Sequence, residues 1–96
     1  DLVNTADDKG YTPLIIAAYN GQEAVVRALL HRGADLQASD AAGNTALMGA
    51  AFKGYAGMVE ALMEAGADVN ARNGQGANAL TFAATLVFRE RLIARQ

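Results

Sequence analysis

Cysteine and tryptophan are absent from this chain, which also holds a single proline and a single histidine. A chain without cysteine forms no disulfide and no Cys-ligated zinc site, and its cellular compartment stays open, with a slight preference for the cytoplasm. No apolar run approaches the roughly 18 residues of a membrane-spanning helix, so we expect no membrane span. The chain begins at Asp1 rather than Met, without a signal-like apolar stretch, so we expect a processed or excised piece.

The chain also lacks a large excess of charge of either sign. The net charge is −2 at pH 7 and the isoelectric point lies near 5.1. General nucleic-acid binding needs clustered Lys and Arg, so we expect no nucleic-acid partner. With 52% hydrophobic and 19% charged residues, the composition fits a folded, soluble protein rather than a disordered one. Alanine supplies much of the hydrophobic share, which predicts a thin and closely spaced core.

What the chain does have is an internal repeat of 33 residues. Gly10, Gly43 and Gly76 share one position of this repeat, and many apolar residues follow the same spacing. We assign 7–39 to a first unit, 40–72 to a second and 73–96 to a third, with 1–6 as the end of a preceding unit. Such periodicity marks a solenoid, in which each unit buries its apolar face only by stacking on its neighbours. We therefore expect residues 1–96 to form one repeat domain.

Each full unit reads as two short antiparallel helices joined by a projecting turn. Thr12 is a good N-cap and Pro13 suits the first helical position, where its missing N–H costs nothing. Gly21 ends this first helix, and Glu23 opens a second helix that stops at Gly33. Helices of about two to three turns are unstable alone in water, so stability has to come from stacking.

The third unit departs from this pattern. Asn78 replaces the capping threonine, which predicts a slightly weaker helix start, and Val87 replaces the glycine that ends the first helix in the other units. A β-branched residue resists the left-handed conformation, so the corner between the two helices must differ there. Arg91, Arg95 and Gln96 stand where the inner units place aliphatic residues. We interpret 73–96 as a C-terminal capping repeat whose polar outer face meets water.

Two stretches carry a family resemblance. Both resemble ankyrin repeats. The first consists of G-Y-T-P-L-I-I-A-A-Y-N-G followed by V-V-R-A-L-L-H-R-G-A-D-L. The second consists of G-N-T-A-L-M-G-A-A-F-K-G followed by M-V-E-A-L-M-E-A-G-A-D-V-N-A. The resemblance implies an all-α solenoid of stacked helix-turn-helix units with projecting β-hairpin-like turns. The family's usual histidine, which ties neighbouring turns together, is replaced here by Ile15, Met48 and Thr81. We therefore expect this array to rely more on apolar contact.

Nothing in the sequence favours an enzyme. It has no Gly-rich phosphate loop, no nucleophile elbow and no metal-binding cluster of His and Asp, and we expect neither a cofactor nor a metal. Asp35 and Asp68 are equivalent positions on adjacent units, separated by the stacking distance of about 10 Å with no cleft between them. Loop carboxylates that accept hydrogen bonds from local backbone N–H groups are the simpler interpretation. His31 is interpreted as a solvated cation at a helix end.

The resemblance also implies a partner-binding surface. In ankyrin arrays the turns and the first helices line a concave face that binds partners. On that face we place Asp8, Lys9, Tyr11, Tyr19, Asn44, Phe52, Lys53, Arg72 and Gln75. Tyr, Phe and Arg are enriched at interface hot spots. Tyr19 and Phe52 share one repeat position, so stacking on each other across the units is an equally open role for them.

The leading functional hypothesis is a protein–protein interaction module with a rigid, pre-organised surface. The alternative is a structural solenoid segment of a larger ankyrin-repeat protein, whose partner site lies outside this piece. A designed scaffold is disfavoured by the irregular Val87 and the missing histidines. The first unit keeps inner-type apolar residues with nothing but 1–6 before it, so self-association through the N-terminal face is also possible.

Overall fold

The computed structural model describes residues 2–94, an elongated body of 49 × 27 × 21 Å. The chain forms, in order, the short 3-10 helix η1 (Leu2–Asn4) and the α-helices α1 (Pro13–Tyr19), α2 (Glu23–His31), α3 (Ala46–Lys53), α4 (Ala56–Glu64) and α5 (Ala79–Ala94). About half of the described residues are helical, and the only strand-like pairing among them is an isolated bridge between Ser39 and Thr45. The predicted all-α class is confirmed.

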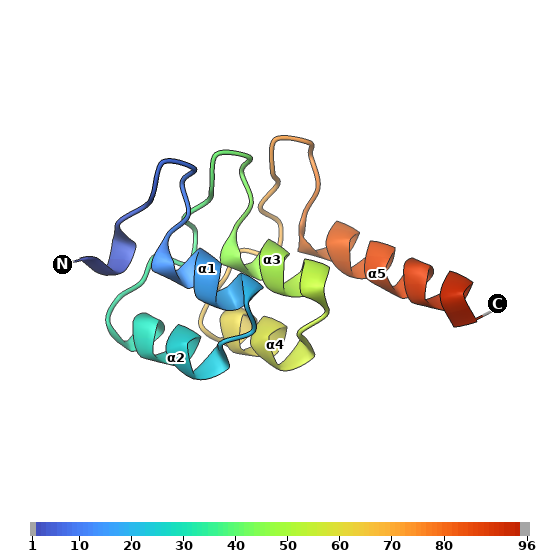
Figure 1. Ribbon diagram of the computed structural model, residues 1–96, viewed down its shortest axis with the longest axis horizontal. Helices are drawn as coiled ribbons and strands as arrows, with labels where there is room; N and C mark the ends of the chain where they lie inside the picture. Colours follow the sequence, from blue (N-terminus) through green and yellow to red (C-terminus); the bar gives the residue numbers. More distant parts are fainter. Residues whose placement is uncertain (1, 95–96) are drawn as a thin grey trace.

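The helices form two layers (Figure 1). The helices α1, α3 and α5 lie in one layer, with α3 in the middle packing against both neighbours, while α2 packs on α1 and α4 packs on α3 in the second layer. Three loops project from the first layer on the same side, before α1, α3 and α5. This is the predicted stack of helix-turn-helix units for the first two repeats. No helix within residues 2–94 is long and apolar enough to cross a membrane.

The predicted helix starts are confirmed. The Thr12 hydroxyl accepts a hydrogen bond from Ile15 N at 3.2 Å, and Pro13 follows it at the first helical position. The Thr45 hydroxyl accepts in the same way from Met48 N at 3.3 Å, while the Met48 sulfur accepts from Thr45 N at 3.5 Å. Both threonines are buried, so their side chains satisfy N–H groups that would otherwise lie unpaired inside the protein.

Backbone hydrogen bonds tie the projecting turns together. Ala41 N donates to Lys9 O, and one repeat later Gly74 N donates to Ala42 O, both at 2.9 Å. A Cβ atom on Gly10 would lie 2.9 Å from Ala41 N, and one on Gly43 would lie equally close to Gly74 N. Glycine is therefore required here by the close approach of the next turn as well as by its positive φ. The expectation that apolar contact would replace the histidine hydrogen bonds is incomplete, because the main chain itself joins the turns.

A second row of hydrogen bonds runs along the opposite loops. The Asn4 side chain donates to Gly33 O and accepts from Asp35 N. One repeat later, the Gln37 side chain donates to Gly66 O and accepts from Asp68 N. Each repeat is thus joined to the next by an amide side chain that bridges one carbonyl and one N–H.

The carboxylates of Asp35 and Asp68 serve these same loops. Asp35 Oδ1 accepts from Gln37 N, and Asp68 Oδ1 accepts from Asn70 N, each at 2.9 Å. This is the local backbone role that the sequence predicted for both residues.

The core lies in the first two repeats. The largest fully buried side chains are Leu14, Val26, Leu47, Met48 and Leu62. Small buried residues such as Ala18 and Ala50 let α1 and α3 pack closely, as the alanine content predicts. In contrast, no residue of α5 is buried.

The third unit differs from the prediction. Instead of two helices with an altered corner, it forms the single continuous helix α5, and Val87 lies in its interior. No non-glycine residue of the described chain has a positive φ, so the β-branched Val87 avoids the left-handed conformation by letting the helix continue. Arg91 is exposed on this helix, and Arg95 and Gln96 lie outside the described residues. The capping role of 73–96 stays a prediction.

The expected weakness at the start of α5 is also not observed. Thr81 N donates to Asn78 Oδ1 at 3.0 Å, and Asn78 N donates to Thr81 Oγ1 at 3.2 Å. These two reciprocal bonds form a capping box, and asparagine is as good an N-cap as threonine. Thr81, which stands at the family's histidine position, therefore compensates for the absence of the Thr-Pro pair at the start of α5.

Candidate functional site

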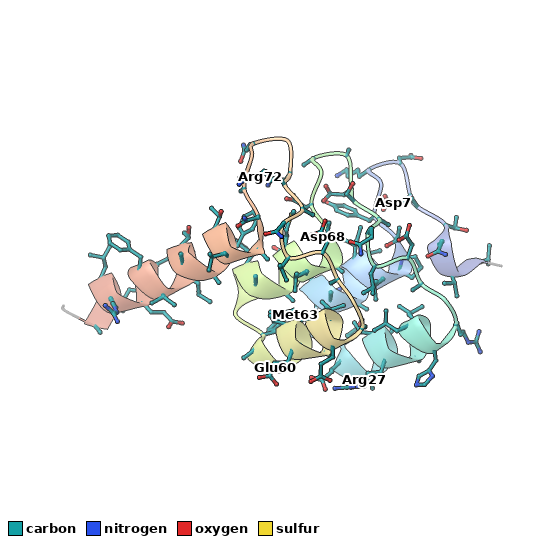
Figure 2. The ribbon with its side chains drawn as sticks, turned by 180° about the vertical axis from the view of Figure 1, so that it is seen from behind. Asp7, Arg27, Glu60, Met63, Asp68 and Arg72 are labelled. Atoms are coloured by element: carbon teal, nitrogen blue, oxygen red, sulfur yellow. The ribbon has the colours of Figure 1, made fainter. Side chains whose placement is uncertain are left out.

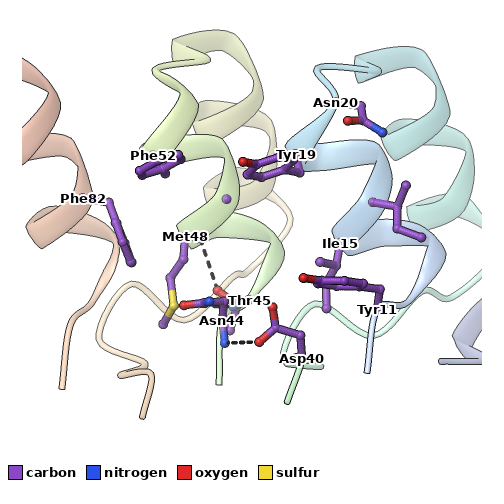
Figure 3. Close-up of a pocket in the computed structure, with 12 residues that line it drawn as sticks. Tyr11, Ile15, Tyr19, Asn20, Asp40, Asn44, Thr45, Met48, Phe52 and Phe82 are labelled. Carbon is purple, nitrogen blue, oxygen red and sulfur yellow. Dashed lines mark hydrogen bonds between the residues drawn. The ribbon is translucent and has the colours of Figure 1, made fainter. Parts of the chain in front are cut away.

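A groove of about 490 Å³ lies on the face formed by α1, α3, α5 and the middle projecting turn (Figure 3). Its lining residues are Tyr11, Ile15, Ile16, Tyr19, Asn20, Asp40, Asn44, Thr45, Met48, Gly49, Phe52 and Phe82. Most of these side chains are aromatic or aliphatic, and the polar ones lie toward the turn or at the end of α1. The groove crosses all three repeat units, so it exists only because the units stack.

An aromatic row forms one side of the groove. Tyr19 and Phe52 have ring centroids 6.4 Å apart and planes 9° apart, while Phe52 meets Phe82 edge to face with centroids 6.0 Å apart. The three rings come from α1, α3 and α5 in turn (Figure 3). Tyr19 and Phe52 do stack across repeats, yet they remain 45% and 39% exposed. The row therefore stabilises the stack and still offers aromatic surface to solvent.

Lys53 lies beside this row. Its Nζ atom is 4.9 Å from the centroid of the Tyr19 ring, within the range of a cation–π interaction. This contact links α3 back to α1 and places a positive charge at the edge of the aromatic surface.

Gly49 leaves the space in which the groove forms. It stands in the interior of α3, at the repeat position that Ile16 and Phe82 occupy in the other units. A Cβ atom at Gly49 would lie 3.5 Å from Tyr19 Cδ1, an ordinary contact distance. Glycine inside a helix costs about 1 kcal/mol relative to alanine, and packing does not require it here. Without a side chain, Gly49 adds no bulk to the groove that it lines beside Tyr19.

The turn side of the groove is held by a hydrogen-bond network. Asp40 Oδ1 accepts from Ala42 N and Asn44 N, each at 2.9 Å. Asn44 Oδ1 accepts from Asn73 Nδ2 of the following turn, also at 2.9 Å. These bonds fix the backbone of the middle turn, so this wall of the groove is rigid.

The nine residues predicted for partner binding fall into two groups. Tyr11, Tyr19, Asn44 and Phe52 line the groove, and Lys53 borders it through Tyr19. The others stand on exposed parts of the first and third projecting turns: Asp8, Lys9, Arg72 and Gln75. Arg72 is held across its turn, where its Nη1 donates to Gly76 O at 2.7 Å (Figure 2). Their binding roles stay predictions.

Several lining residues were not predicted: Ile15, Ile16, Asn20, Asp40, Thr45, Met48, Gly49 and Phe82. The repeat spacing itself contained the signal for three of them. Ile16, Gly49 and Phe82 are equivalent positions, and a large residue, no side chain and an aromatic residue in succession indicate a hollow over the middle unit. The aromatic wall of the third unit was missed because Phe82 lies three positions before the one equivalent to Tyr19 and Phe52.

A second hollow, of about 540 Å³, lies on the N-terminal side of the stack. Its lining includes Leu2, Pro13, Val25 and Leu29. Val25 of α2 is exposed on this side, where η1 is the described element that precedes the first unit. This is the face for which the sequence suggested self-association.

The groove offers contact surface rather than reactive groups. Within residues 2–94, no three His, Asp or Glu side chains lie together in a way that could hold a metal ion. The Asp40 carboxylate, which lines the groove, is occupied by two backbone N–H groups. The arrangement is therefore suited to binding apolar and aromatic side chains between a rigid turn and a row of rings.

Comparison with known sequences identifies the architecture. A family model of ankyrin repeats in three copies matches residues 1–73. The chain belongs to the ankyrin-repeat family. The match covers the first two repeats and ends at the start of the third projecting turn, before α5.

Individual ankyrin-repeat proteins match over a shorter segment. The chain is 58% identical over 36 residues to ankyrin repeat domain-containing protein 49 of Bos taurus, which is 38% of this chain and 15% of that protein. It is 51% identical over 37 residues to ankyrin repeat family A protein 2 of Mus musculus and of Homo sapiens, which is 38% of this chain and 12% of each relative. The matched segment is thus a small part of these relatives. Ankyrin repeats are in general protein–protein interaction modules and a non-enzymatic fold.

Proposed function

We propose that this chain binds another protein in the groove that crosses α1, α3 and α5. The observation that carries this proposal is the aromatic row of Tyr19, Phe52 and Phe82 along the groove, in which Tyr19 and Phe52 are 45% and 39% exposed. Truncation of such aromatic side chains at the centre of an interface commonly costs more than about 2 kcal/mol of binding free energy. The groove is also continuous across the units, which suits an extended segment or a ridge of the partner.

Rigidity supports the same proposal. The turn wall is fixed by Asp40 and Asn44, and the neighbouring turns are joined by main-chain hydrogen bonds. A surface that is already ordered loses little conformational entropy when a partner binds. The energy of the aromatic contacts is therefore available for affinity.

The exposed turns add a polar rim. Asp8, Lys9 and Gln75 are exposed residues of the projecting turns that precede α1 and α5. Charged rim residues contribute mainly to the association rate and to partner choice. We assign them the role of orienting the partner, with the deeper contacts made by Tyr11, Tyr19 and Phe52.

The proposal is tested with matched baits in a pull-down from the native host, read by mass spectrometry. The baits are the unmodified chain, Phe52→Ala and Met63→Ala. Met63 is an exposed apolar residue on α4, in the layer opposite the groove, and serves as the control (Figure 2). A protein captured by the unmodified chain and by Met63→Ala, but lost with Phe52→Ala, supports the groove.

Amide shift mapping with the captured partner then locates the contact. Shifts concentrated on Tyr11, Tyr19, Asn44 and Phe52 are expected. Equal capture by all three baits, with shifts away from the groove, would contradict the proposal. In that case the chain acts as a structural segment for a site formed elsewhere.

A further inference from the structure

Among the residues that line the groove, Asp40 alone carries a formal charge. Its Oδ1 atom accepts both side-chain hydrogen bonds of the middle turn, from Ala42 N and Asn44 N at 2.9 Å each. The other carboxylate oxygen points into the groove (Figure 3). Within residues 2–94, no group donates a hydrogen bond to this second oxygen, and no basic side chain forms a salt bridge with Asp40. The groove thus contains a negative charge that its own chain leaves unpaired.

The turn itself does not need this charge. Asn73 is the residue equivalent to Asp40 one repeat later, and its Oδ1 atom accepts from Gln75 N at 2.9 Å and from Ala77 N at 3.0 Å. Asparagine and aspartate both close turns in this way, because each supplies the acceptor oxygen. A neutral amide therefore holds the third turn as the carboxylate holds the second. The charge of Asp40 is left for interaction with a ligand.

The surroundings of Asp40 suit a basic side chain. A Cβ atom on Gly10 would lie 3.0 Å from Asp40 Cα, so Tyr11, the next residue, leaves the first turn beside Asp40. Tyr11 and Ile15 line the groove at this end (Figure 3). Arginine and lysine combine a hydrocarbon stem, which packs on apolar surface, with a cationic head group. The stem can therefore contact Tyr11 and Ile15 while the head group reaches the carboxylate.

We propose that the protein bound in the groove inserts an arginine or lysine side chain at the turn end, where its cation pairs with Asp40. An apolar or aromatic side chain of the same segment then lies on the row of Tyr19 and Phe52. This assignment rests on the function proposed above and names the chemistry of the partner segment. Pairing offsets the desolvation of Asp40 that any occupant of the groove causes, whereas an apolar occupant would leave the carboxylate buried without a partner.

The charges at the two ends of the groove have opposite signs. Asp40 belongs to the turn, while the Nζ atom of Lys53 lies 4.9 Å from the Tyr19 ring centroid, at the aromatic row. A cation is attracted by the first charge and repelled by the second. The basic residue of the partner is therefore directed to the turn end, which fixes the direction in which the segment lies.

The test begins with a library of random heptapeptides displayed on phage and selected on the full 96-residue chain. Parallel selections use Asp40→Asn, Asp7→Asn and Phe52→Ala. Peptides enriched on the unmodified chain should carry Arg or Lys together with an aromatic or large aliphatic residue. Selection on Asp40→Asn should lose the preference for Arg and Lys, and selection on Phe52→Ala should lose the enriched peptides.

Asp7→Asn is the matched control. Asp7 is equivalent to Asp40 one repeat earlier, and its Oδ1 atom accepts from Lys9 N and Tyr11 N at 2.9 Å each. Asp7 does not line the groove. The same loss of charge at an equivalent turn should therefore leave the preference for basic peptides unchanged.

One enriched peptide is then titrated by fluorescence anisotropy. Its dissociation constant should rise by about tenfold with Asp40→Asn, because a charge-assisted hydrogen bond is lost, and should stay within about twofold with Asp7→Asn. Replacing the basic residue of the peptide by glutamine should cause a similar loss on the unmodified chain and little further loss on Asp40→Asn. The exchange in the peptide also gives a result if Asp40→Asn does not fold, which circular dichroism checks.

The outcomes separate this inference from the groove itself. Peptides that depend on Phe52 but lack basic residues, or that bind Asp40→Asn and the glutamine peptide as tightly as the originals, would overturn the pairing with Asp40 and leave the groove as the binding site. Selections in which no enriched peptide depends on Phe52 would overturn the groove, and the pairing with it.

Discussion

Leu86 of α5 fills the space beside Gly54, the glycine that ends α3 with a φ of 75°. A Cβ atom on Gly54 would overlap with the Leu86 side chain, so the missing side chain is part of the contact between α3 and α5. The equivalent Gly21 approaches the ring of Tyr55 in the same manner, one repeat earlier. The glycines that follow α1 and α3 thus have two roles, allowing the left-handed conformation and admitting a side chain of the next repeat.

We expect Gly54→Ala to destabilise the protein more than Gly33→Ala does. Both glycines have positive φ, which costs alanine roughly 1–2 kcal/mol, but nothing lies within 4 Å of a Cβ atom on Gly33. The difference between the two variants in urea unfolding therefore reports the Leu86 contact. Equal losses of unfolding free energy would show that α5 does not depend on this contact.

Val87→Gly is expected to lower the unfolding free energy by about 1 kcal/mol relative to Val87→Ala, since Val87 lies inside a continuous helix where glycine is unfavourable. The loss should be accompanied by weaker helical circular dichroism. An increase in stability with glycine would instead indicate a helix pair with a corner at residue 87, as in the first two repeats.

Gly49→Ala is expected to separate stability from binding. The added methyl group meets Tyr19 at an ordinary contact distance and removes a helix-interior glycine, so the unfolding free energy should rise by about 0.5–1 kcal/mol. The same methyl group occupies the floor of the groove, so affinity for a groove-bound partner should fall in a calorimetric titration. Gly57→Ala, on α4 away from the groove, is the control and should leave affinity unchanged.

Gln37→Ala is expected to lower the unfolding free energy by about 1 kcal/mol, because two hydrogen bonds between repeats are lost. Asn70 occupies the equivalent position one repeat later, and among residues 2–94 its side chain makes no hydrogen bond to another repeat. Asn70→Ala should therefore change stability by less than about 0.5 kcal/mol. Chemical denaturation of the two variants side by side checks this, and a similar loss in both would contradict the proposed role of Gln37.

The sequence was sufficient for the first four α-helices because their signals are local and agree with one another. Thr12 and Thr45 cap α1 and α3, Gly21 and Gly54 follow the ends of these two helices, and the apolar spacing sets the buried faces of all four. The third unit could not be predicted in this way. Its residues favour one long helix, while the resemblance to ankyrin repeats favours two, and only packing decides between them.

The candidate groove was predicted in part. Residue type pointed to Tyr19 and Phe52, because aromatic residues at a repeated position suggest a surface row. Gly49 and Phe82 depend on how side chains of neighbouring helices share space, and no local signal gives the distance between Gly49 and the Tyr19 ring. The Asn44 contact with Asn73 likewise arises only when the second and third turns are stacked.

The two rows of hydrogen bonds between repeats lie on different sets of loops: Lys9 to Ala41 at the projecting turns, and Asn4 to Asp35 at the opposite loops. Each row fixes the number of residues that separates a donor from its acceptor. If one residue were inserted between the two rows, the donors and acceptors of one row could stay paired only if those of the other row moved apart. Changes in length are therefore tolerated mainly as whole repeats, and we expect homologues of this protein to vary in repeat number far more than in repeat length.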